Sequence, residues 1–582
     1  MQPFSCGRHQ SAPRSVAHAG HASSVRGKYL LGLGIPPLLA LLVYFRLPEL
    51  GWTYDDPSTL ESTERAIAEG WRFVFRSPRS LTYLLHAANY VVSGHAPAGW
   101  HLVNLGLHLL ATQLFTILAY RLRASLLGAV VAGCLFAVHP VHVEAVASVS
   151  NRKDVLATLL AVTALLLWTH GSRSRRMLAG VALVASAGAK ETVTLGAIPL
   201  LLLCDRLAPQ PAERRPEVRR RGLLVAAAWV VGVGAMAQLS GIWRADSRES
   251  MIFALSDGCA STYSKHLELV VASAPEVAKL LVWPTHLSAD YPLASADEAP
   301  HRLKVIVALV SVLAILLLRN VPSRSPAMEF CLAWVLLSWL PVSNIIPTTR
   351  FFVADRYLYL PSGGVCLGAG WLFAAVWART RNASLRWLTA GAMSTILAVW
   401  GTAVTHRVQD WRDDATLWNA ALREGHDSWR IRVNVARAML SRGDAESAEK
   451  HFRCALGFNS AYLPTHKELV RTIYVSGDTA RAQAEEARMR RSEALQAAAL
   501  GKLEICLQAC DRASDLASEG WRSYLDCGDL LRRQGRPWEA IAVLRAGTRR
   551  VPAEASVASA LQEVLASGGT TRAAPALGTA AP

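Results

Sequence analysis

The residues best suited to chemistry are acids and cations that interrupt long apolar segments of the chain. Asp55 and Asp56 are adjacent carboxylates that follow the first of these segments. Adjacent carboxylates repel each other, so the pair either shares a proton or is held by a divalent cation. A carboxylate here could deprotonate an acceptor hydroxyl, a contribution of about 10²–10⁴ in rate. The alternative is structural: both residues begin a helix ahead of Pro57, a residue favoured in the first helical turn.

A histidine motif, HPVHVE at 139–144, closes another apolar segment. His139 and His142 are three residues apart and could ligate a metal ion. Pro140 breaks the helical hydrogen-bond ladder between them and frees a backbone carbonyl. We favour histidines that bond to this kinked backbone over histidines that ligate a metal.

Cations at the ends of apolar segments form a third group of candidates. Lys190 and Glu191 are adjacent, and they form either a structural pair or a cationic contact for phosphate. Arg356 either marks a membrane interface, together with the tyrosines beside it, or binds phosphate bidentately. The segment NRKD at 151–154 is explained by capping and anchoring of the next helix. No glycine-rich nucleotide loop is visible, which favours a lipid-borne sugar donor over a nucleotide sugar.

These candidates lie between apolar segments long enough to cross a membrane. Of the 582 residues, 52% are hydrophobic and 18% are charged, against about 25% charged in soluble proteins. Backbone groups have no water to bond to inside lipid, so these segments must be helices. At about 20 apolar residues for each crossing, we predict about eleven spans, near 28–46, 101–120, 124–146, 154–170, 177–189, 192–205, 222–240, 302–318, 328–346, 357–378 and 387–405.

Charge orients the predicted spans. The net charge of +17 comes from basic residues in short loops, the pattern of the positive-inside rule and not of a nucleic-acid-binding face. With the N-terminal tail in the cytoplasm, alternate loops are short and basic, and the opposite loops hold the acids. This arrangement places everything after about residue 406 outside the cytoplasm. We therefore predict a multi-pass protein of the bacterial inner membrane, with its polar candidates on one, periplasmic side and with no nucleic-acid partner.

Past residue 406 the composition becomes that of a soluble, charged domain. Gly443 and Gly477 are 34 residues apart, the period of a tetratricopeptide (TPR) helical repeat. Gly535 fits the same template, and 494–520 looks like a degenerate unit between them. The sequence therefore predicts about three to four TPR units.

The ten cysteines are scattered, and none forms a CxxC pair. Cys506 and Cys510 are four residues apart and would share one helix face. We interpret the cysteines as small apolar packing residues.

In their order along the chain, these motifs resemble the transmembrane-and-TPR O-mannosyltransferase family (TMTC) and its bacterial relatives. HPVHVEAV and RYLYLPS are specific, whereas TPR repeats alone are not. The chain departs from the family pattern at Ser80, where the family has proline, and at Asn151, where it has glycine. The resemblance covers nearly the whole chain and rests on YDD at 54–56, RSLT at 79–82, WHLVNLGLH at 100–108, HPVHVEAV at 139–146, KE at 190–191, DRYLYLPS at 355–362 and DWRD at 410–413.

The resemblance implies a GT-C fold, an all-α polytopic helix bundle followed by a TPR α-solenoid. It also implies a catalytic acid in the first extracytoplasmic loop, at Asp55 or Asp56, and a polyprenyl-phosphate sugar, mannose, as the donor. A protein hydroxyl would be the acceptor, held by the TPR domain. A divalent cation at the acidic pair is the only cofactor considered. The predicted contacts to substrate or lipid phosphate are Arg79, His139, His142, Glu144, Arg152, Asp154, Lys190, Glu191, Asp355, Arg356 and Tyr357.

The predicted organisation has five parts. They are a cytoplasmic tail at 1–26, a GT-C-like transmembrane domain at 27–406, a linker at 407–427, an extracytoplasmic TPR domain at 428–565 and a second tail at 566–582. The alternative function is a non-catalytic, membrane-anchored TPR scaffold for assembly of envelope complexes. That alternative does not require acids at the outer ends of the spans.

Overall fold

The computed structural model describes residues 32–122, 124–169, 172–207, 215–240, 263–292, 326–347, 351–460 and 462–566. Within these ranges every regular element is helical, so the all-α fold class predicted from the sequence is confirmed. The chain divides into two compact units, residues 1–425 and 426–582. The predicted span at 302–318, the predicted tail at 1–26 and residues 567–582 of the second tail lie outside the described residues.

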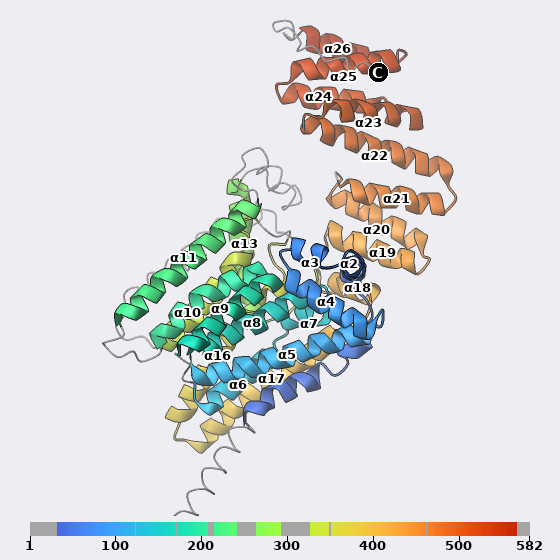
Figure 1. Ribbon diagram of the computed structural model, residues 1–582. Coiled ribbons are helices and arrows are strands. Elements are labelled where there is room, and N and C mark those ends of the chain that lie inside the picture. The colour runs from blue at the N-terminus through green and yellow to red at the C-terminus, as the bar shows by residue number, and fades with distance from the viewer. Residues whose placement is uncertain are drawn as a thin grey trace, which may run out of the picture. The chain divides into compact units, whose positions relative to one another are not determined.

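The first unit is a helical bundle in which α5 (Pro97–Arg121) contacts α6 (Leu126–Ala137) and α8 (Arg152–Thr169). Figure 1 shows α5 and α6 running side by side. α8 in turn packs on α9 (Arg173–Ala189) and α10 (Glu191–Leu207). The other long helices described in this unit are α11 (Arg215–Ser240), α13 (Tyr263–Val282), α15 (Pro326–Trp339), α16 (Ser362–Arg379) and α17 (Ala383–Asp410).

Glycines on α16 allow its backbone to lie in direct contact with the backbones of two neighbouring helices. A Cβ atom at Gly370 would overlap the carbonyl oxygen of Gly128 on α6, and one at Gly364 would meet the carbonyl oxygen of Cys331 on α15 at 2.7 Å. Helices that approach through small residues are common in membrane bundles. These contacts fix the position of α16, and with it the polar segment that leads into this helix.

Two described helices, α5 and α17, are long and apolar enough to cross a membrane. This finding rests on length and composition alone. Shorter apolar helical segments that overlap predicted spans lie at Leu126–Ala137, Glu191–Cys204, Leu223–Ala235 and Ala327–Val342.

The segment around the histidine motif differs from its prediction. A single span over 124–146 is wrong, because α6 ends at Ala137 and α7 (His142–Ala147) begins only after a break. Pro140 lies in the break, where it cannot continue the backbone hydrogen-bond ladder. The result is a short buried helix that starts at the second histidine of the motif.

Helices also occupy the polar stretch that precedes α5 and the segment that follows α17. The stretch before α5 contains α2 (Asp56–Glu69), α3 (Trp71–Arg76) and α4 (Ser80–Ser93). α18 (Asp414–Arg423) lies within the segment predicted as a linker, and it belongs to the first unit. Asp413 starts α18 with a capping box, since its side chain accepts from the backbone of Thr416 and the Thr416 hydroxyl accepts in return.

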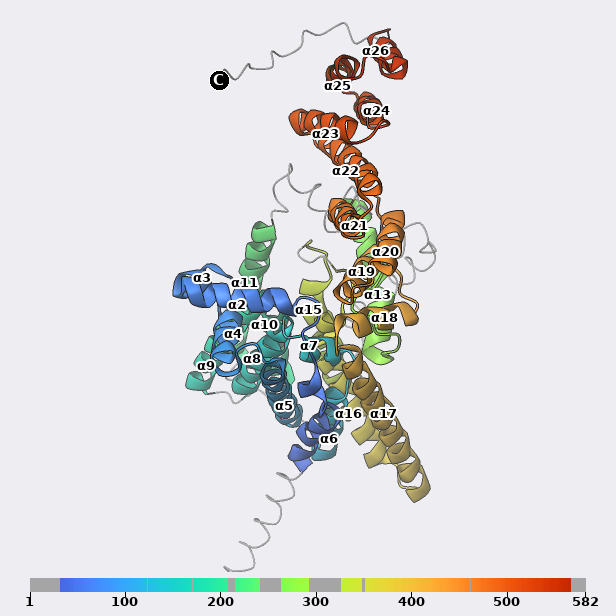
Figure 2. The same ribbon diagram turned by 90° about the vertical axis from the view of Figure 1, so that its right-hand side faces the viewer.

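The second unit consists of consecutive helices, each packed on the next. Figures 1 and 2 show these helices stacked in chain order. They are α19 (Trp429–Ser441), α20 (Ala445–Phe458), α21 (Leu463–Val475), α22 (Thr479–Ala499), α23 (Leu503–Leu516), α24 (Arg522–Arg533), α25 (Pro537–Arg550) and α26 (Ala555–Ala566).

Glycines with positive φ form turns between these helices. Gly443, Gly477 and Gly535, which the repeat template had selected, have φ values of 81°, 86° and 72°. Gly501, with φ 74°, forms the turn between α22 and α23 and was not predicted. Only glycine adopts this conformation without steric cost.

Candidate active site

Asp56 is the first residue of α2 and is fully buried. Its Oδ1 accepts hydrogen bonds from the backbone N–H of Ser150 at 2.8 Å and from the hydroxyl of Ser148 at 3.1 Å. Burial raises the pKa of Asp56 to about 6, and these hydrogen bonds oppose the increase. The carboxylate therefore fastens the loop between α7 and α8 to the start of α2, in a place that an acceptor molecule does not reach.

Asp55, by contrast, is exposed, and it precedes α2 without making a side-chain capping hydrogen bond. Tyr54 lies in the left-handed region with φ 57°, which is rare for a residue other than glycine. Its N–H donates to Oδ1 of Asp414 at 2.7 Å, and its ring packs edge-on against Trp418 with 5.2 Å between centroids. α18 thus holds the strained turn from which the Asp55 carboxylate projects.

Four of the predicted acids and cations form two ion pairs at one turn. Nζ of Lys190 lies 2.5 Å from Oδ1 of Asp154, and both side chains are buried. Arg79 makes a two-point contact with Glu191, from Nη2 to Oε1 at 2.9 Å and from Nε to Oε2 at 3.3 Å. Because Lys190 directly follows α9 and Glu191 begins α10, the two pairs lie next to each other.

A third ion pair joins Arg356 to Glu144, again among buried side chains. The backbone N–H of Arg356 donates to Oε2 of Glu144 at 2.9 Å, and Nη1 donates to Oε1. The guanidinium also lies over the rings of Phe351 and Tyr357, at 4.8 and 5.0 Å from the centroids. Nζ of Lys190 lies 4.9 Å from the same Tyr357 ring. Tyr357 therefore connects the Arg356 pair to the Lys190 pair.

The exposed Asp55 and the Arg356 pair both lie within electrostatic reach of the Tyr54 hydroxyl. Burial, followed by the negative charge of Asp55, raises the pKa of Tyr54. Arg356 lowers the pKa of the same hydroxyl, so that both the acid and the guanidinium lie within electrostatic reach of it. We call these residues and the three ion pairs the polar cluster, and its members are Tyr54, Asp55, Arg79, Glu144, Asp154, Lys190, Glu191, Arg356 and Tyr357.

Asp355, at the edge of the polar cluster, has a hydrogen-bond partner that the sequence did not indicate, and Arg407 lies within electrostatic reach of it. Its Oδ1 accepts from the hydroxyl of Tyr291 at 2.5 Å, and burial followed by the charge of Glu144 raises its pKa. Arg407, near the end of α17, opposes that increase and is only 5% exposed. Nε and Nη2 of Arg407 have no hydrogen-bond partner in the described part of the chain. Its Nη1 pairs with Oδ2 of Asp410 at 3.2 Å. An arginine near the end of a long apolar helix was the available signal for Arg407.

Arg152 makes its hydrogen bonds to α5, while its Nη1 has no hydrogen-bond partner among the described residues. Its Nε donates to Oδ1 of Asn104 at 2.6 Å, and its Nη2 donates to the carbonyl oxygen of Trp100 at 2.8 Å. The guanidinium also lies over the Trp100 ring. These contacts attach the start of α8 to α5.

The two motif histidines bond to protein groups. Nε2 of His139 lies 3.2 Å from the carbonyl oxygen of Leu281, and Nε2 of His142 lies 2.7 Å from the hydroxyl of Ser362. Among the described residues, side chains suited to hold an ion converge at three cysteines of the second unit, and not at these histidines or at the acidic pair. Both oxygens of Asp56 accept hydrogen bonds from neighbouring N–H and O–H groups.

Fold and site together define an all-helical protein whose first polar segment presents an exposed acid beside paired, buried cations. The chain is 25% identical to the protein O-mannosyl-transferase Tmtc1 of Drosophila melanogaster over 77% of its length. It is 27% identical to the protein O-mannosyl-transferase F38B6.6 of Caenorhabditis elegans over 66%, and 24% identical to the human protein O-mannosyl-transferase TMTC3 over 68%. The resemblance to the TMTC protein O-mannosyl-transferases that the motifs indicated is thereby confirmed.

These relatives are longer than the chain. It spans 64%, 54% and 46% of their respective lengths, which is about half to two thirds. No family model matches the chain.

Proposed function

We propose that this protein is a membrane glycosyltransferase that moves a sugar, mannose, from a polyprenyl-phosphate donor to a hydroxyl group of a protein acceptor. The observation that carries the proposal is the exposed Asp55 carboxylate next to Tyr54, whose hydroxyl lies within electrostatic reach of the buried Arg356 pair. The relatives' name, protein O-mannosyl-transferase, supports the sugar and the class of acceptor. The lipid phosphate rests on the family resemblance and on the cations available to it.

The proposed setting is the bacterial inner membrane, with the N-terminus in the cytoplasm and the second unit, as a TPR domain, in the periplasm. Apolar side chains exposed on several helices support a lipid environment, among them Leu42, Val184 and Trp387 at 68%, 75% and 76%. Single cysteines at the exposed positions Ala68 and Ser174 should then be labelled from opposite sides of the membrane.

In the proposed reaction, Asp55 takes the proton of the acceptor hydroxyl. The resulting oxygen attacks the anomeric carbon, a new carbon–oxygen bond forms, and the bond to the lipid phosphate breaks with inversion. The phosphate leaves with the electron pair of that bond. Asp56 acts as a positioning residue, since its hydrogen bonds hold the loops around the site but its carboxylate is covered.

The leaving phosphate requires positive charge that is already in place before the reaction. Arg356 is fixed by Glu144 and by two rings, so that its remaining nitrogens are oriented without further ordering. Lys190 supplies a second buried cation across the Tyr357 ring. Arg407 adds two donors without partners among the described residues. These three cations are the groups that we propose for the phosphate.

The test is transfer of labelled mannose from polyprenyl-phosphate mannose to a cell extract by the purified protein. Asp55→Asn should lower the transfer rate by about 10²-fold or more, the scale of a lost general base. Glu61→Gln, which alters another exposed acid of α2, is the matched control and should leave the rate unchanged. A wild-type protein without any transfer would favour the scaffold function, and full activity of Asp55→Asn would refute the assignment of the base.

A further inference from the structure

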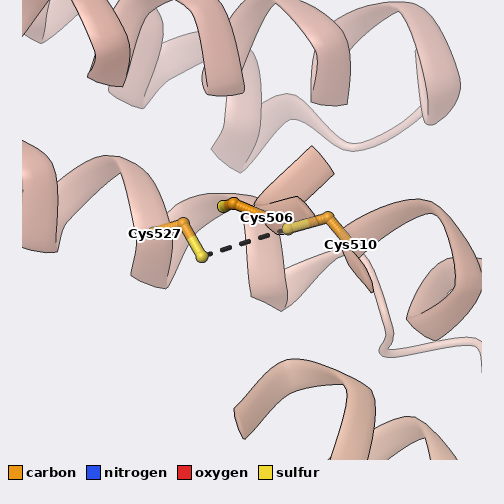
Figure 3. Close-up of side chains that lie close together, drawn as sticks. All are labelled: Cys506, Cys510 and Cys527. Carbon is orange, nitrogen blue, oxygen red and sulfur yellow. Dashed lines mark hydrogen bonds between the residues drawn. The ribbon is translucent and has the colours of Figure 1, made fainter. Parts of the chain in front are cut away.

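Three cysteines meet in the interior of the second unit. Cys506 and Cys510 are one turn apart on α23, and Cys527 lies on α24. Figure 3 shows these three side chains close together. Their sulfur atoms all lie within 4.8 Å of one another, and the sulfurs of Cys510 and Cys527 are 4.0 Å apart. The three thiols form one group, which is not shared with the polar cluster of the first unit.

The surroundings of the three thiols are mostly apolar, with the buried Ser523 hydroxyl within hydrogen-bonding reach of Cys510. All three cysteines are fully buried, in a core whose other members are alanine, leucine, isoleucine and valine side chains together with Tyr524. Within the described residues, no histidine, carboxylate or further cysteine joins the three sulfurs. A tetrahedral zinc ion needs four ligands, so the group is one ligand short of a structural zinc site.

The net charge of the complex, like the number of sulfur ligands, limits which ion can bind. Burial of a net charge among apolar side chains is costly unless a partner neutralises it. Three thiolates around a monovalent or divalent ion leave a net negative charge, whereas three thiolates around a trivalent ion give a neutral complex. A trivalent ion that is satisfied by three sulfur ligands therefore fits both the number of thiols and their surroundings.

We propose that Cys506, Cys510 and Cys527 form a binding site for a trivalent thiophilic ion of the arsenic(III) class. With arsenite, three arsenic–oxygen bonds break and three arsenic–sulfur bonds form. The three thiol protons leave with the three hydroxyl groups as water, and no atom changes its oxidation state. Bound arsenic would join α23 to α24 and stabilise this part of the second unit.

The test uses the full-length protein, reduced and purified in detergent, with arsenite as the probe. The expected result is one arsenic atom retained per chain after desalting, with an intact-mass gain of one arsenic less three hydrogens. Alkylation of the folded protein, compared with the arsenite-free protein and followed by peptide mass spectrometry, should show added protection of Cys506, Cys510 and Cys527 together. The melting temperature should rise, because a ligand that binds only the folded state stabilises it.

Variants that each lack one of the three cysteines distinguish a three-thiol site from nonspecific binding of arsenite. Cys506→Ala, Cys510→Ala and Cys527→Ala should each lose the retained arsenite, yet still bind phenylarsine oxide, which needs only two thiols. Cys454→Ala removes the exposed cysteine of the same unit and should keep one arsenic per chain. Melting of the variants without arsenite shows whether each is folded, and the protection pattern of the wild type does not depend on any variant. The proposal is overturned if the wild type retains no arsenic, if a different set of cysteines is protected, or if a folded Cys510→Ala variant retains arsenite at the wild-type level.

Discussion

The backbone N–H of Tyr54 donates to Oδ1 of Asp414 at 2.7 Å, across 360 residues of sequence. Tyr54 has a positive φ of 57°, and a non-glycine residue in that conformation must be held by its surroundings. The hydrogen bond and the contact of its ring with Trp418 hold it there. The helix that follows the last long apolar helix therefore sets the direction of the acid that follows Tyr54.

Removal of the Asp414 carboxylate, which accepts the hydrogen bond from Tyr54, should lower the rate because Asp55 is then less well positioned. The protonation of Asp55 should not change. Asp414→Ala is expected to lower kcat about tenfold, the value of roughly one lost hydrogen bond, with little change in KM. Asp414→Asn keeps an oxygen at the same place and should restore most of the rate. The pH profile should be the same in both variants, since neither touches the base. Equal kcat in Asp414→Ala and the wild type would contradict this role.

Asp56 should make stability depend on pH in a defined direction. Its pKa is about 6 in the folded chain, above the ordinary value of 3.8, so folding favours its protonated form. The corresponding stabilisation, about 3 kcal/mol, is fully present below pH 3.8 and is lost as the pH rises through 6. Asp56→Asn stays neutral, so the wild-type melting temperature should fall relative to this variant between about pH 4 and pH 6.

Asp55→Asn is the matched control for that measurement. The melting temperature of the Asp55→Asn variant should depend on pH as that of the wild type does, although this variant loses transfer activity. Parallel melting curves for the wild type and Asp56→Asn across this pH range would show that the buried carboxylate does not change its protonation on folding.

Arg356→Lys tests the proposed grip on the lipid phosphate. Lysine keeps the charge but loses the planar fork. We expect KM for the polyprenyl-phosphate donor to rise about tenfold, the scale of one charge-assisted hydrogen bond, while KM for the acceptor is unchanged. Arg46→Lys, in an exposed pair with Glu49, should alter neither constant. A purely structural role for Arg356 would instead lower stability and leave the kinetics of the folded fraction as they were.

Truncation separates the two units. A chain that ends after Gly425 keeps α18 and the contact from Asp414 to Tyr54. It should still transfer mannose to a small hydroxyl acceptor or to water, while transfer to the protein acceptor falls about tenfold or more. A chain that ends after Asp410 lacks α18 and should lose both activities. Full-rate modification of the protein acceptor by the longer truncation would exclude acceptor binding by the second unit.

Features that depend on local sequence were predicted correctly. The spans predicted from apolar length and composition at 101–120 and 387–405 lie within α5 and α17. Pro57 and the acids before it indicated the start of α2, and three of the turn glycines followed from the repeat period. Such features depend on backbone geometry over a few residues, which the side chains of those residues largely decide.

The arrangement of the side chains in the polar cluster could not be predicted from local sequence. The sequence did not distinguish Asp55 from Asp56 as the catalytic base. Only the packing of the helices shows that Asp55 is exposed and that Asp56 is buried. Arg152 and Arg356 were equal candidates for phosphate, yet one is bound to α5 and the other to Glu144.

By itself, the sequence determined the all-α fold class, the apolar segments, the turn glycines and the family resemblance of this protein. The tertiary structure decided which acid is exposed, which cations are paired and which side chains share a site. Arg356 and Glu144 are 212 residues apart, and Tyr54 and Asp414 are 360 apart. The free energy of such pairs depends on distance, burial and the remaining partners of each group, which exist only once the helices have packed.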